Sequence, residues 1–323
     1  MKGLKLSALL SACGAKLVSG NDVLISSIEE NAGDVKKGSL FVCVKGLTAD
    51  GHDFIPEALS KGASAVLAER KIRTGAASLA VAADTRKALK KIAFFMYGKN
   101  LKKAKITGVT GTKGKTTVSY MIASVLEASG RGPVSVIGTV GYRIGKKVYE
   151  AKNTTPSNLV LLKLIDESVR KNAREIVMEI SSHALDQGRV DNIPLDTAVM
   201  TNVTRDHFDY HKNFKNYLAA KLKIVSCLKK NGLLVVNLDD KNADKFIGLA
   251  KGRRVCGYSM RRKACVKASG FEPSIKGSKL EVKARGEAIR VDSGLIGEHN
   301  AHNLMAAIAA TAGKVRPGII GRA

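Results

Sequence analysis

Tryptophan is absent from this 323-residue chain, and aromatic residues make up only 5% of it. No apolar run approaches the roughly 20 residues of a membrane-spanning helix, and no segment is repeated or of low complexity. These absences exclude a membrane-spanning protein and a repeat protein, and they predict a soluble globular protein with no membrane partner. Because the length exceeds that of a usual single core, it predicts two domains.

Cysteine is also scarce. The five cysteines form no Cys-x-x-Cys pair and lack zinc-binding spacing; they stand at positions 13, 43, 227, 256 and 265. We therefore expect reduced thiols in a cytoplasmic protein. Lys2, Lys5 and the string Leu-Ser-Ala-Cys ending at Cys13 mimic a bacterial lipoprotein cleavage site, but the apolar stretch Leu6–Ala12 is at the minimum length of a signal peptide. We interpret it as an opening helix, because the phosphate-binding loop predicted below needs cytoplasmic ATP.

Acidic residues are the third shortage. The chain has 28 of them against 54 lysines and arginines, which gives a net charge of +26 at pH 7. Such a charge attracts nucleic acid or an anionic nucleotide substrate. The basic residues are spread along the chain, do not alternate with aromatic ones, and form no known nucleic-acid module. We therefore expect no nucleic-acid partner, with a basic nucleic-acid-binding ATPase as an alternative.

Residues 108–117, which read GVTGTKGKTT, stand between a β-branched run and a helical pattern. Glycines let backbone N–H groups approach an anion, a lysine adds charge, and the hydroxyl after it can bind magnesium. The spacing Gly111-x-x-Gly114-Lys115-Thr116 is shorter than the Walker pattern, which would need glycine where Val109 stands. The segment predicts a loop for the phosphates of ATP, with a plain strand-to-helix turn as the alternative.

The remaining pattern predicts an α/β protein with two domains. Residues 1–98 predict a small α/β domain with strands at 39–44, 65–68 and 78–82 and helices at 54–61 and 85–97. Residues 99–312 predict a mostly parallel sheet covered by helices, because the strands are apolar on both faces. The expected strands are 105–109, 134–138, 175–180, 197–201 and 233–237, with a hairpin around residue 145 and helices at 116–128, 157–171 and 299–311. After Arg253, glycine-separated strands predict a smaller antiparallel appendage to about Ile296.

Polar residues follow the strands 175–180 and 197–201. Ligands collect at the carboxyl ends of parallel strands, so Glu179 and His207, together with Thr116, could anchor magnesium beside phosphate oxygens. Ordinary polar loop groups are the alternative. Spacing alone does not distinguish Lys221 from a surface lysine.

Three segments, in this order along nearly the whole chain, resemble the Mur ligase family, and most closely its MurE type. Residues 111–117 resemble the family's ATP loop, and Asn153-Thr-Thr-Pro156 resembles its substrate segment. Residues 179–190, which read EISSHALDQGRV, are the most specific stretch. They point to the MurE type rather than to folylpolyglutamate synthase or other Mur enzymes.

The resemblance implies an ATP-dependent ligase of peptidoglycan synthesis that adds a diamino acid, meso-diaminopimelate or L-lysine, to UDP-MurNAc-L-Ala-D-Glu through an acyl phosphate. It also implies the roles of individual residues. ATP would bind at Gly111, Thr112, Lys113, Gly114, Lys115, Thr116, Thr117, Asn237, His299 and Asn300; the precursor at Leu47, Thr48, Ala49, Asn153, Thr154, Thr155, Ser181, Gln187 and Arg189; magnesium at Thr116, Glu179, His207 and Lys221 as a carbamate; and Lys115, Lys221 and His207 would act in catalysis.

The chain departs from the family pattern in two places. Asn31-Ala-Gly33 stands where the family usually reads Asp-Ser-Arg, so a serine contact to uracil is lost in the uridine-binding domain 1–98. The motif 295–303 ends the central domain 99–312, after which the family continues with a further domain. Here only a tail, 313–323, follows. We therefore expect impaired turnover in a chain that lacks the domain selecting the diamino acid.

Two further alternatives remain open at this point. One is a non-catalytic nucleotide- or precursor-binding fragment, and the other is a folylpolyglutamate or cyanophycin-type ligase. A monomer is the expected oligomeric state.

Overall fold

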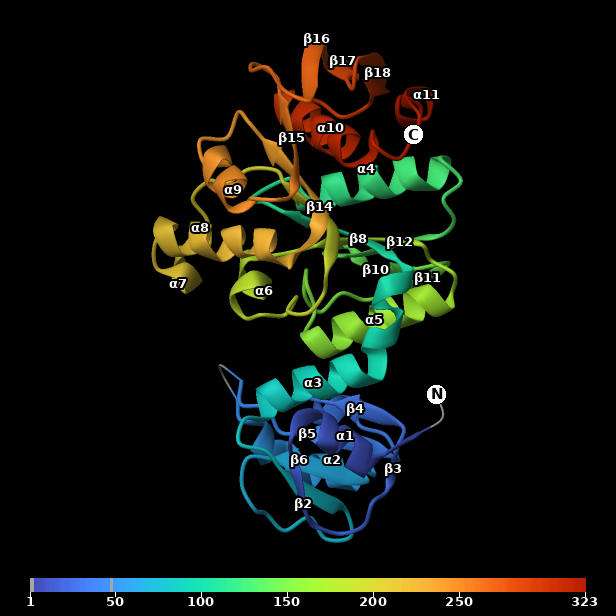
Figure 1. Cartoon of the computed structure of the whole chain (residues 1–323), viewed down its shortest axis with the longest axis vertical. Coiled ribbons are helices and arrows are strands. Elements are labelled where there is room, and N and C mark those ends of the chain that lie inside the picture. The colour runs from blue at the N-terminus through green and yellow to red at the C-terminus, as the bar shows by residue number, and fades with distance from the viewer. Residues whose placement is uncertain (1–2, 47–48) are drawn as a thin grey trace. The chain divides into compact units, whose positions relative to one another are not determined.

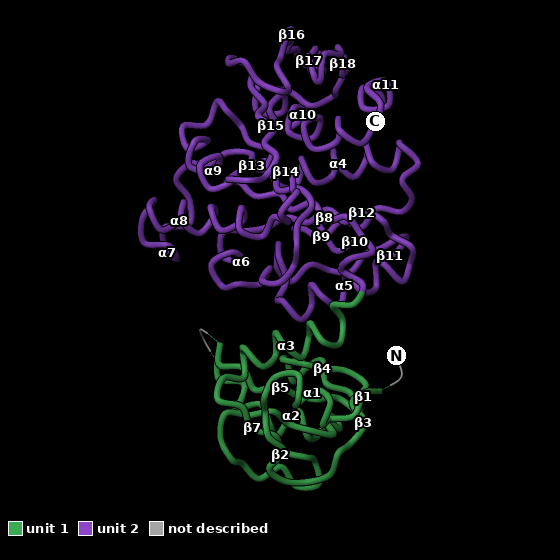
Figure 2. Tube along the Cα trace, viewed as in Figure 1, with its two compact units in different colours: residues 1–99 green, residues 100–323 purple. Residues whose placement is uncertain are grey.

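The computed structural model describes residues 3–46 and 49–323 and divides the chain into two compact units, Met1–Lys99 and Asn100–Ala323 (Figure 2). The boundary predicted after residue 98 lies next to this division. Each unit contains its own sheet (Figure 1).

The described part of unit 1 has a five-stranded sheet in the order β2-β7-β6-β5-β4. Its strands β4–β7 run parallel, and β2 is antiparallel to β7. Strands β5 and β6 are buried along their whole length, which explains their apolar runs. The bounds are β1 Leu4–Lys5, β2 Lys16–Ser19, β3 Leu24–Ile25, β4 Ser27–Glu29, β5 Ser39–Val42, β6 Ala65–Ala68, β7 Ser78–Val81, α1 Leu6–Cys13, α2 Ile55–Ser60 and α3 Thr85–Tyr97. The predicted opening helix is confirmed as α1.

Unit 2, whose residues are all described, has one eleven-stranded sheet in the order β11-β10-β9-β12-β8-β13-β14-β15-β16-β17-β18. Strands β9, β12, β8, β13, β14 and β15 run parallel, and for all of them except β15 this agrees with the sequence prediction. The strand bounds are β8 Lys105–Thr110, β9 Val134–Gly138, β10 Gly141–Ile144, β11 Lys147–Tyr149, β12 Glu175–Glu179, β13 Leu195–Met200, β14 Leu228–Asn237, β15 Arg254–Ser259, β16 Val266–Ser274, β17 Gly277–Ala284 and β18 Glu287–Ser293.

Helices cover this sheet, and α4 and α10 pack against each other over it. The buried face of α10 carries small residues, among them Ala301, Ala306 and Ala309, so the helix approaches α4 and strands β14 to β17 closely. The helix bounds are α4 Lys115–Ala128, α5 Asn158–Arg170, α6 Ser182–Asp186, α7 Phe208–His211, α8 Phe214–Leu222, α9 Ala243–Leu249, α10 Glu298–Thr311 and α11 Pro317–Ile320. Helix α11 lies in the predicted tail and packs against β18 and α4.

The antiparallel appendage predicted after Arg253 is confirmed as strands β16 to β18, but the first strand after Arg253 is parallel. Strand β15 is parallel to β14, and β16 joins β15 in parallel through two residue pairs, Tyr258 with Val266 and Ser259 with Lys267. The antiparallel strands β16 to β18 therefore extend the same sheet. Apolar alternation shows which face of a strand is buried, but it does not show in which direction its neighbour runs.

Strand β14 begins before its predicted start at residue 233. Leu195 pairs with Leu228 and Thr197 pairs with Leu233, so residues 229–232 bulge out of the ladder. These four residues read Lys-Lys-Asn-Gly, a polar run that the apolar pattern assigns to a loop. The bulge carries two adjacent lysines to one edge of the sheet. No helix in the described parts of the chain is long and apolar enough to cross a membrane.

Candidate functional site

The loop between β8 and α4 has the strand-loop-helix context that the sequence predicts. Gly114 precedes the helix with φ of +83°, a conformation that favours glycine. A Cβ atom at Gly111 would collide with Thr201, and one at Gly114 would collide with Asn303. Both glycines are therefore required by close approach, and the loop ends at a helix N-terminus that can accept an anion.

Lys115 folds back across this loop. Its Nζ donates to the carbonyl oxygens of Gly111 and Thr112, each at 2.9 Å. Burial lowers the pKa of Lys115, and the nearby carboxylates of Glu179 and Asp206 oppose that shift. The ammonium group is thus held at the centre of the loop, where a bound phosphate would meet it.

The other loop residues are tied to the end of β13. The Lys113 N–H donates to Asn202 Oδ1 at 3.0 Å, and Thr201 Oγ1 donates to the Lys113 carbonyl at 2.7 Å. The Thr112 hydroxyl lies 2.9 Å from the Tyr217 hydroxyl. The Thr112 side chain therefore holds the loop in place rather than pointing toward a ligand. Thr117 lies half-buried in the first turn of α4.

Thr116 and Glu179 meet across the carboxyl edge of the sheet. Thr116 Oγ1 donates to Glu179 Oε2 at 2.8 Å, and the Glu179 side chain is fully buried at the end of β12. The Thr139 N–H donates to Glu179 Oε1 at 2.9 Å, and the Thr139 hydroxyl to Oε2 at 3.1 Å. Hydroxyl and carboxylate oxygens side by side suit a hard cation that keeps waters and phosphate oxygens as its other ligands.

Within the residues that the structure describes, no group of three His, Cys, Asp or Glu side chains is arranged to hold a metal. Within the predicted magnesium set, Thr116 and Glu179 contact each other directly. The His207 ring lies 4.9 Å from the His183 ring and 6.3 Å from the Tyr217 ring between centroids. His207 itself has φ of +53°, in the left-handed region that residues other than glycine seldom adopt.

Lys221 is buried, with 1% of its surface exposed. Its Nζ donates to the Gly111 carbonyl at 2.7 Å and lies 4.8 Å from the centroid of the Tyr217 ring. Burial holds the pKa of Lys221 well below its usual value, the neighbouring Lys115 lowers it further, and Asp206 opposes them. The fold thus places a buried amine against the phosphate loop, which no spacing in the sequence indicates.

The predicted precursor residues of unit 2 form a network joined to Glu179. The buried Thr155 donates its hydroxyl to the Glu179 carbonyl at 2.8 Å and accepts the Ser181 N–H at 3.0 Å. Arg189 donates to the Thr155 carbonyl at 2.8 Å and to Gln187 Oε1 at 2.9 and 2.7 Å. The fold therefore brings four of these residues together.

Two more predicted precursor residues lie beside this network. The Thr154 hydroxyl is 3.1 Å from that of Thr139, and the Asn153 carbonyl accepts the Tyr142 hydroxyl at 2.7 Å. Through Thr139, which contacts Glu179, this segment adjoins the oxygen pair at the phosphate loop.

The residues predicted near adenine are less uniform. Asn237 is buried at the end of β14, where it donates to the Thr201 carbonyl at 3.0 Å and accepts the Asp239 N–H at 3.0 Å. His299 and Asn300 lie at the start of α10, and Asn303 donates to Asn300 Oδ1 at 3.1 Å. Asn303 also lies against Gly114, so it connects this helix to the phosphate loop.

In unit 1, Leu47 and Thr48 lie outside the described residues. Ala49 beside them accepts the Gly46 N–H at 2.7 Å and follows β5 at its carboxyl end. Asn31, at the departure from the family pattern, caps a short turn by accepting the Gly33 N–H at 3.0 Å. The residue therefore has a local structural role.

Sequence reasoning missed three residues at this edge, namely Thr139, Asn202 and Asn303. Each has a signal in hindsight. Thr139 comes directly after β9, and Asn202 lies two residues after the end of β13. Both are at the carboxyl ends of parallel strands, where ligands collect. Asn303 lies in the segment 295–303 already noted. Their contacts, however, come from elements far apart along the chain.

The family model described as "Mur ligase middle domain" matches residues 109–311, and the one described as "Mur ligase family, catalytic domain" matches residues 24–93. Among curated proteins, UDP-N-acetylmuramoyl-L-alanyl-D-glutamate–2,6-diaminopimelate ligase of Bacillus velezensis is 35% identical over 314 residues. The alignment covers 95% of this chain and 64% of that protein. The ligase of the same name from Aquifex aeolicus is 35% identical over 300 residues, covering 93% and 61% of the two chains.

A solved structure of a ligase with this name has a TM-score of 0.81 and 26% identity, and the match covers 99% of this chain and 66% of that one. The chain therefore spans a little less than two thirds of the curated relatives that it matches. The resemblance extends over both units, and the phosphate loop and its surrounding strands lie within the matched region.

Proposed function

This chain belongs to the Mur ligase family, and we propose that it contains the ATP- and precursor-binding part of a ligase that adds a diamino acid to UDP-MurNAc-L-Ala-D-Glu. The diamino acid would be 2,6-diaminopimelate, the one named for its relatives, or L-lysine. The observation that carries the proposal is the contact of Thr116 with Glu179. It joins the phosphate loop to the network of Thr155, Ser181 and Arg189, so that one cluster can hold both substrates.

Lys115 and the loop amides would hold the phosphates of ATP while the D-glutamate carboxylate takes the γ-phosphoryl group. Preorganised donors of this kind stabilise the charge that develops during phosphoryl transfer. Arg189, held by Gln187 and the Thr155 carbonyl, would orient a precursor carboxylate. An incoming amine would then attack the acyl phosphate, forming an amide and releasing inorganic phosphate.

Thr116 and Glu179 fit magnesium by the chemistry of their oxygens. When bound with phosphate oxygens, this ion neutralises phosphate charge. Glu179 is pre-positioned for that role by the two donations from Thr139. His207, whose ring lies beside those of His183 and Tyr217, would bind a second ion.

Lys221 would act as a carbamate. Its burial favours the neutral amine, which can attack carbon dioxide, form an N–C bond and release one proton. The product is an anionic oxygen donor next to Gly111. Carbamylation therefore relieves the burial of a second ammonium group beside Lys115.

The binding step can be tested by thermal unfolding with UDP-MurNAc-L-Ala-D-Glu. At about a hundredfold excess over Kd, we expect Tm to rise by about 5 °C, and Arg189→Ala to remove the rise. Arg262→Ala, which changes an exposed arginine outside the network, is the matched control. No shift with the unaltered chain contradicts the precursor assignment.

Turnover is tested by the release of inorganic phosphate. Release should require the precursor, and Lys115→Ala should lower it about 10²- to 10³-fold, whereas Lys276→Ala should not. ATP binding with no precursor-dependent release would favour the alternative of a non-catalytic binding unit. Release that persists in Lys115→Ala contradicts the assignment of the loop.

A further inference from the structure

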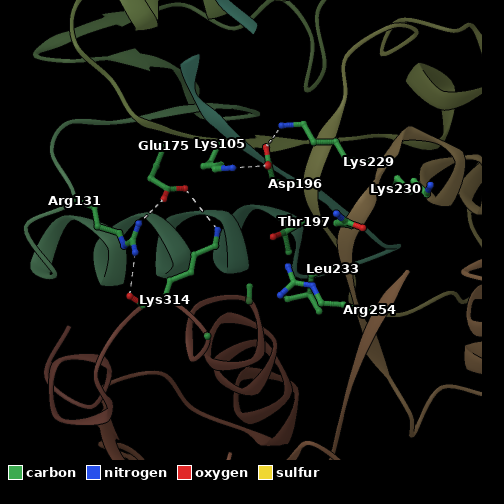
Figure 3. Close-up of a pocket in the computed structure, with 14 residues that line it drawn as sticks. Lys105, Arg131, Glu175, Asp196, Thr197, Lys229, Lys230, Leu233, Arg254 and Lys314 are labelled. Atoms are coloured by element: carbon green, nitrogen blue, oxygen red, sulfur yellow. Dashed lines mark hydrogen bonds and ion pairs between the residues drawn. The ribbon is translucent and has the colours of Figure 1, made fainter. Parts of the chain in front are cut away.

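A pocket lies at the amino edge of the sheet of unit 2, at the opposite ends of the strands that form the candidate active site. It has a volume of about 640 Å³, a size typical of sites for small molecules. Its walls come from the first residues of β8, β12, β13 and β15, from the bulge of β14, and from the segments that follow α4 and α10. Figure 3 shows the charged side chains that line it.

The lining is strongly basic. Six cationic side chains face two carboxylates, Glu175 and Asp196, so positive charge is in excess by four; the cations are Lys105, Arg131, Lys229, Lys230, Arg254 and Lys314. Helices α4 and α10 end at this edge, and their C-termini contribute roughly half a negative charge each. The helix ends therefore offset only about one of the four positive charges.

Two ion-pair clusters fix four of these cations. Asp196 accepts from Lys229 at 2.7 Å and from Lys105 at 3.2 Å. Glu175, only 2% exposed, lies 3.3 Å from Arg131 and 3.7 Å from Lys314. The two carboxylates thus hold cations along the wall without neutralising all of them.

The remaining two cations, Lys230 and Arg254, have no acidic partner among the residues that the structure describes. Both are exposed, and Figure 3 shows both apart from the two ion-pair clusters. Lys230 reaches this position because residues 229–232 bulge from β14. The geometry points to an anion with more than one charged group, since the cations are distributed along the pocket wall.

We propose that this pocket binds a diphosphate, either as inorganic pyrophosphate or as the diphosphate of a nucleotide. Lys230 and Arg254 contact one phosphate group directly, and the Lys229 and Arg131 clusters provide the field for the other. The site is separate from the phosphate loop, which lies at the carboxyl ends of the same strands. Anion binding at this pocket would also account for part of the net charge of +26, which the ligase chemistry does not require.

The test is a calorimetric titration of the full chain carrying Lys115→Ala, which weakens phosphate binding at the loop. Pyrophosphate should bind at one site, more tightly than orthophosphate, and weaken as salt is raised. Lys230→Gln and Arg254→Gln should each lower the affinity about tenfold, the effect of losing one charged hydrogen bond. Lys276→Gln removes the same charge from an exposed turn and should leave the affinity unchanged.

The same titration of the wild-type chain, compared with Lys230→Gln alone, checks the result without the Lys115 substitution. ADP in place of pyrophosphate identifies the source: tighter binding of either compound, with the same loss in Lys230→Gln, supports the diphosphate site. The proposal is overturned if pyrophosphate does not bind, or if Lys276→Gln weakens it as much as Lys230→Gln. It is also overturned if DNA binding depends on Lys230 and Arg254 and pyrophosphate does not compete.

Discussion

The two edges of the sheet in unit 2 use charge in opposite ways. At the carboxyl edge, Lys115 and Lys221 are bonded to backbone carbonyls of the phosphate loop, and burial lowers the pKa of both. At the amino edge, burial raises the pKa of Asp196, but bonds from Lys229 and the Ile106 N–H outweigh it, so that pKa lies below its usual value. At the carboxyl edge backbone carbonyls hold the two lysines, whereas at the amino edge two carboxylates pair with four of the six cations.

The largest difference should appear between two glutamates at opposite ends of β12. Glu179→Gln removes the carboxylate beside Thr116 and should lower precursor-dependent phosphate release by about 10²-fold or more. Glu175→Gln should act mainly on the free energy of unfolding, lowering it by about 1 kcal/mol, because Arg131 and Lys314 can return to water. Phosphate release and urea unfolding of both variants measure this contrast. An equal loss of phosphate release in both variants would contradict the expected difference between the two glutamates.

The next effect concerns the buried amine of Lys221. Lys221→Met should abolish phosphate release without lowering the free energy of unfolding, because methionine needs no desolvation and the Gly111 carbonyl still accepts from Lys115. Urea unfolding of the variant and the wild type provides the measurement. A loss of stability larger than about 2 kcal/mol would show that the ammonium group is a net stabiliser.

The pH dependence of stability follows from the same group. The folded pKa of Lys221 lies well below its usual value, so between that pKa and the unfolded value the unfolded chain binds the extra proton. Stability should therefore rise with pH in this window, by up to about 1.4 kcal/mol per pH unit, and level off above the unfolded pKa near 10.4. Lys221→Met should lose this slope, which urea unfolding at several pH values would reveal; an unchanged slope would assign it to another group.

At the amino edge, the pH dependence of stability that comes from Asp196 is smaller and falls in the acidic range. The folded pKa of Asp196 is lowered, so its contribution is present above the unfolded pKa of about 3.9 and is lost as pH falls through the folded value. Asp196→Asn should cost about 1 kcal/mol at neutral pH and nothing in acid. Unfolding measured at neutral and acidic pH tests this, and a cost that persists in acid would contradict an ionic origin.

The smallest effect is expected for Lys105→Gln. This lysine pairs with Asp196 at 3.2 Å, but 62% of its side chain is exposed. Exposed pairs contribute little, so the free energy of unfolding should fall by no more than about 0.5 kcal/mol. A clearly larger loss in urea unfolding would mean that the amino edge depends on this lysine more than its exposure indicates.

Local sequence patterns predict much of the fold and part of the site. The phosphate loop is predictable because its glycines, lysine and hydroxyl are adjacent, and Glu179 because it ends an apolar strand. The position of Lys221 against Gly111 is not, since it depends on how α8 packs, and the same holds for Asn303 beside Gly114. The amino-edge pocket depends on the bulge at residues 229–232, and the polar residues of this segment predict a loop instead of a strand.

Helix α10 has a mechanical consequence. Only two residue pairs connect the parallel strands to the antiparallel strands β16 to β18. We call this narrow connection between β15 and β16 the seam. Helix α10 packs on strands at both sides of that seam and reaches Gly114 through Asn303. It therefore bridges the two parts of the sheet. A force on the antiparallel strands would be transmitted to the phosphate loop along this helix as well as through the two residue pairs.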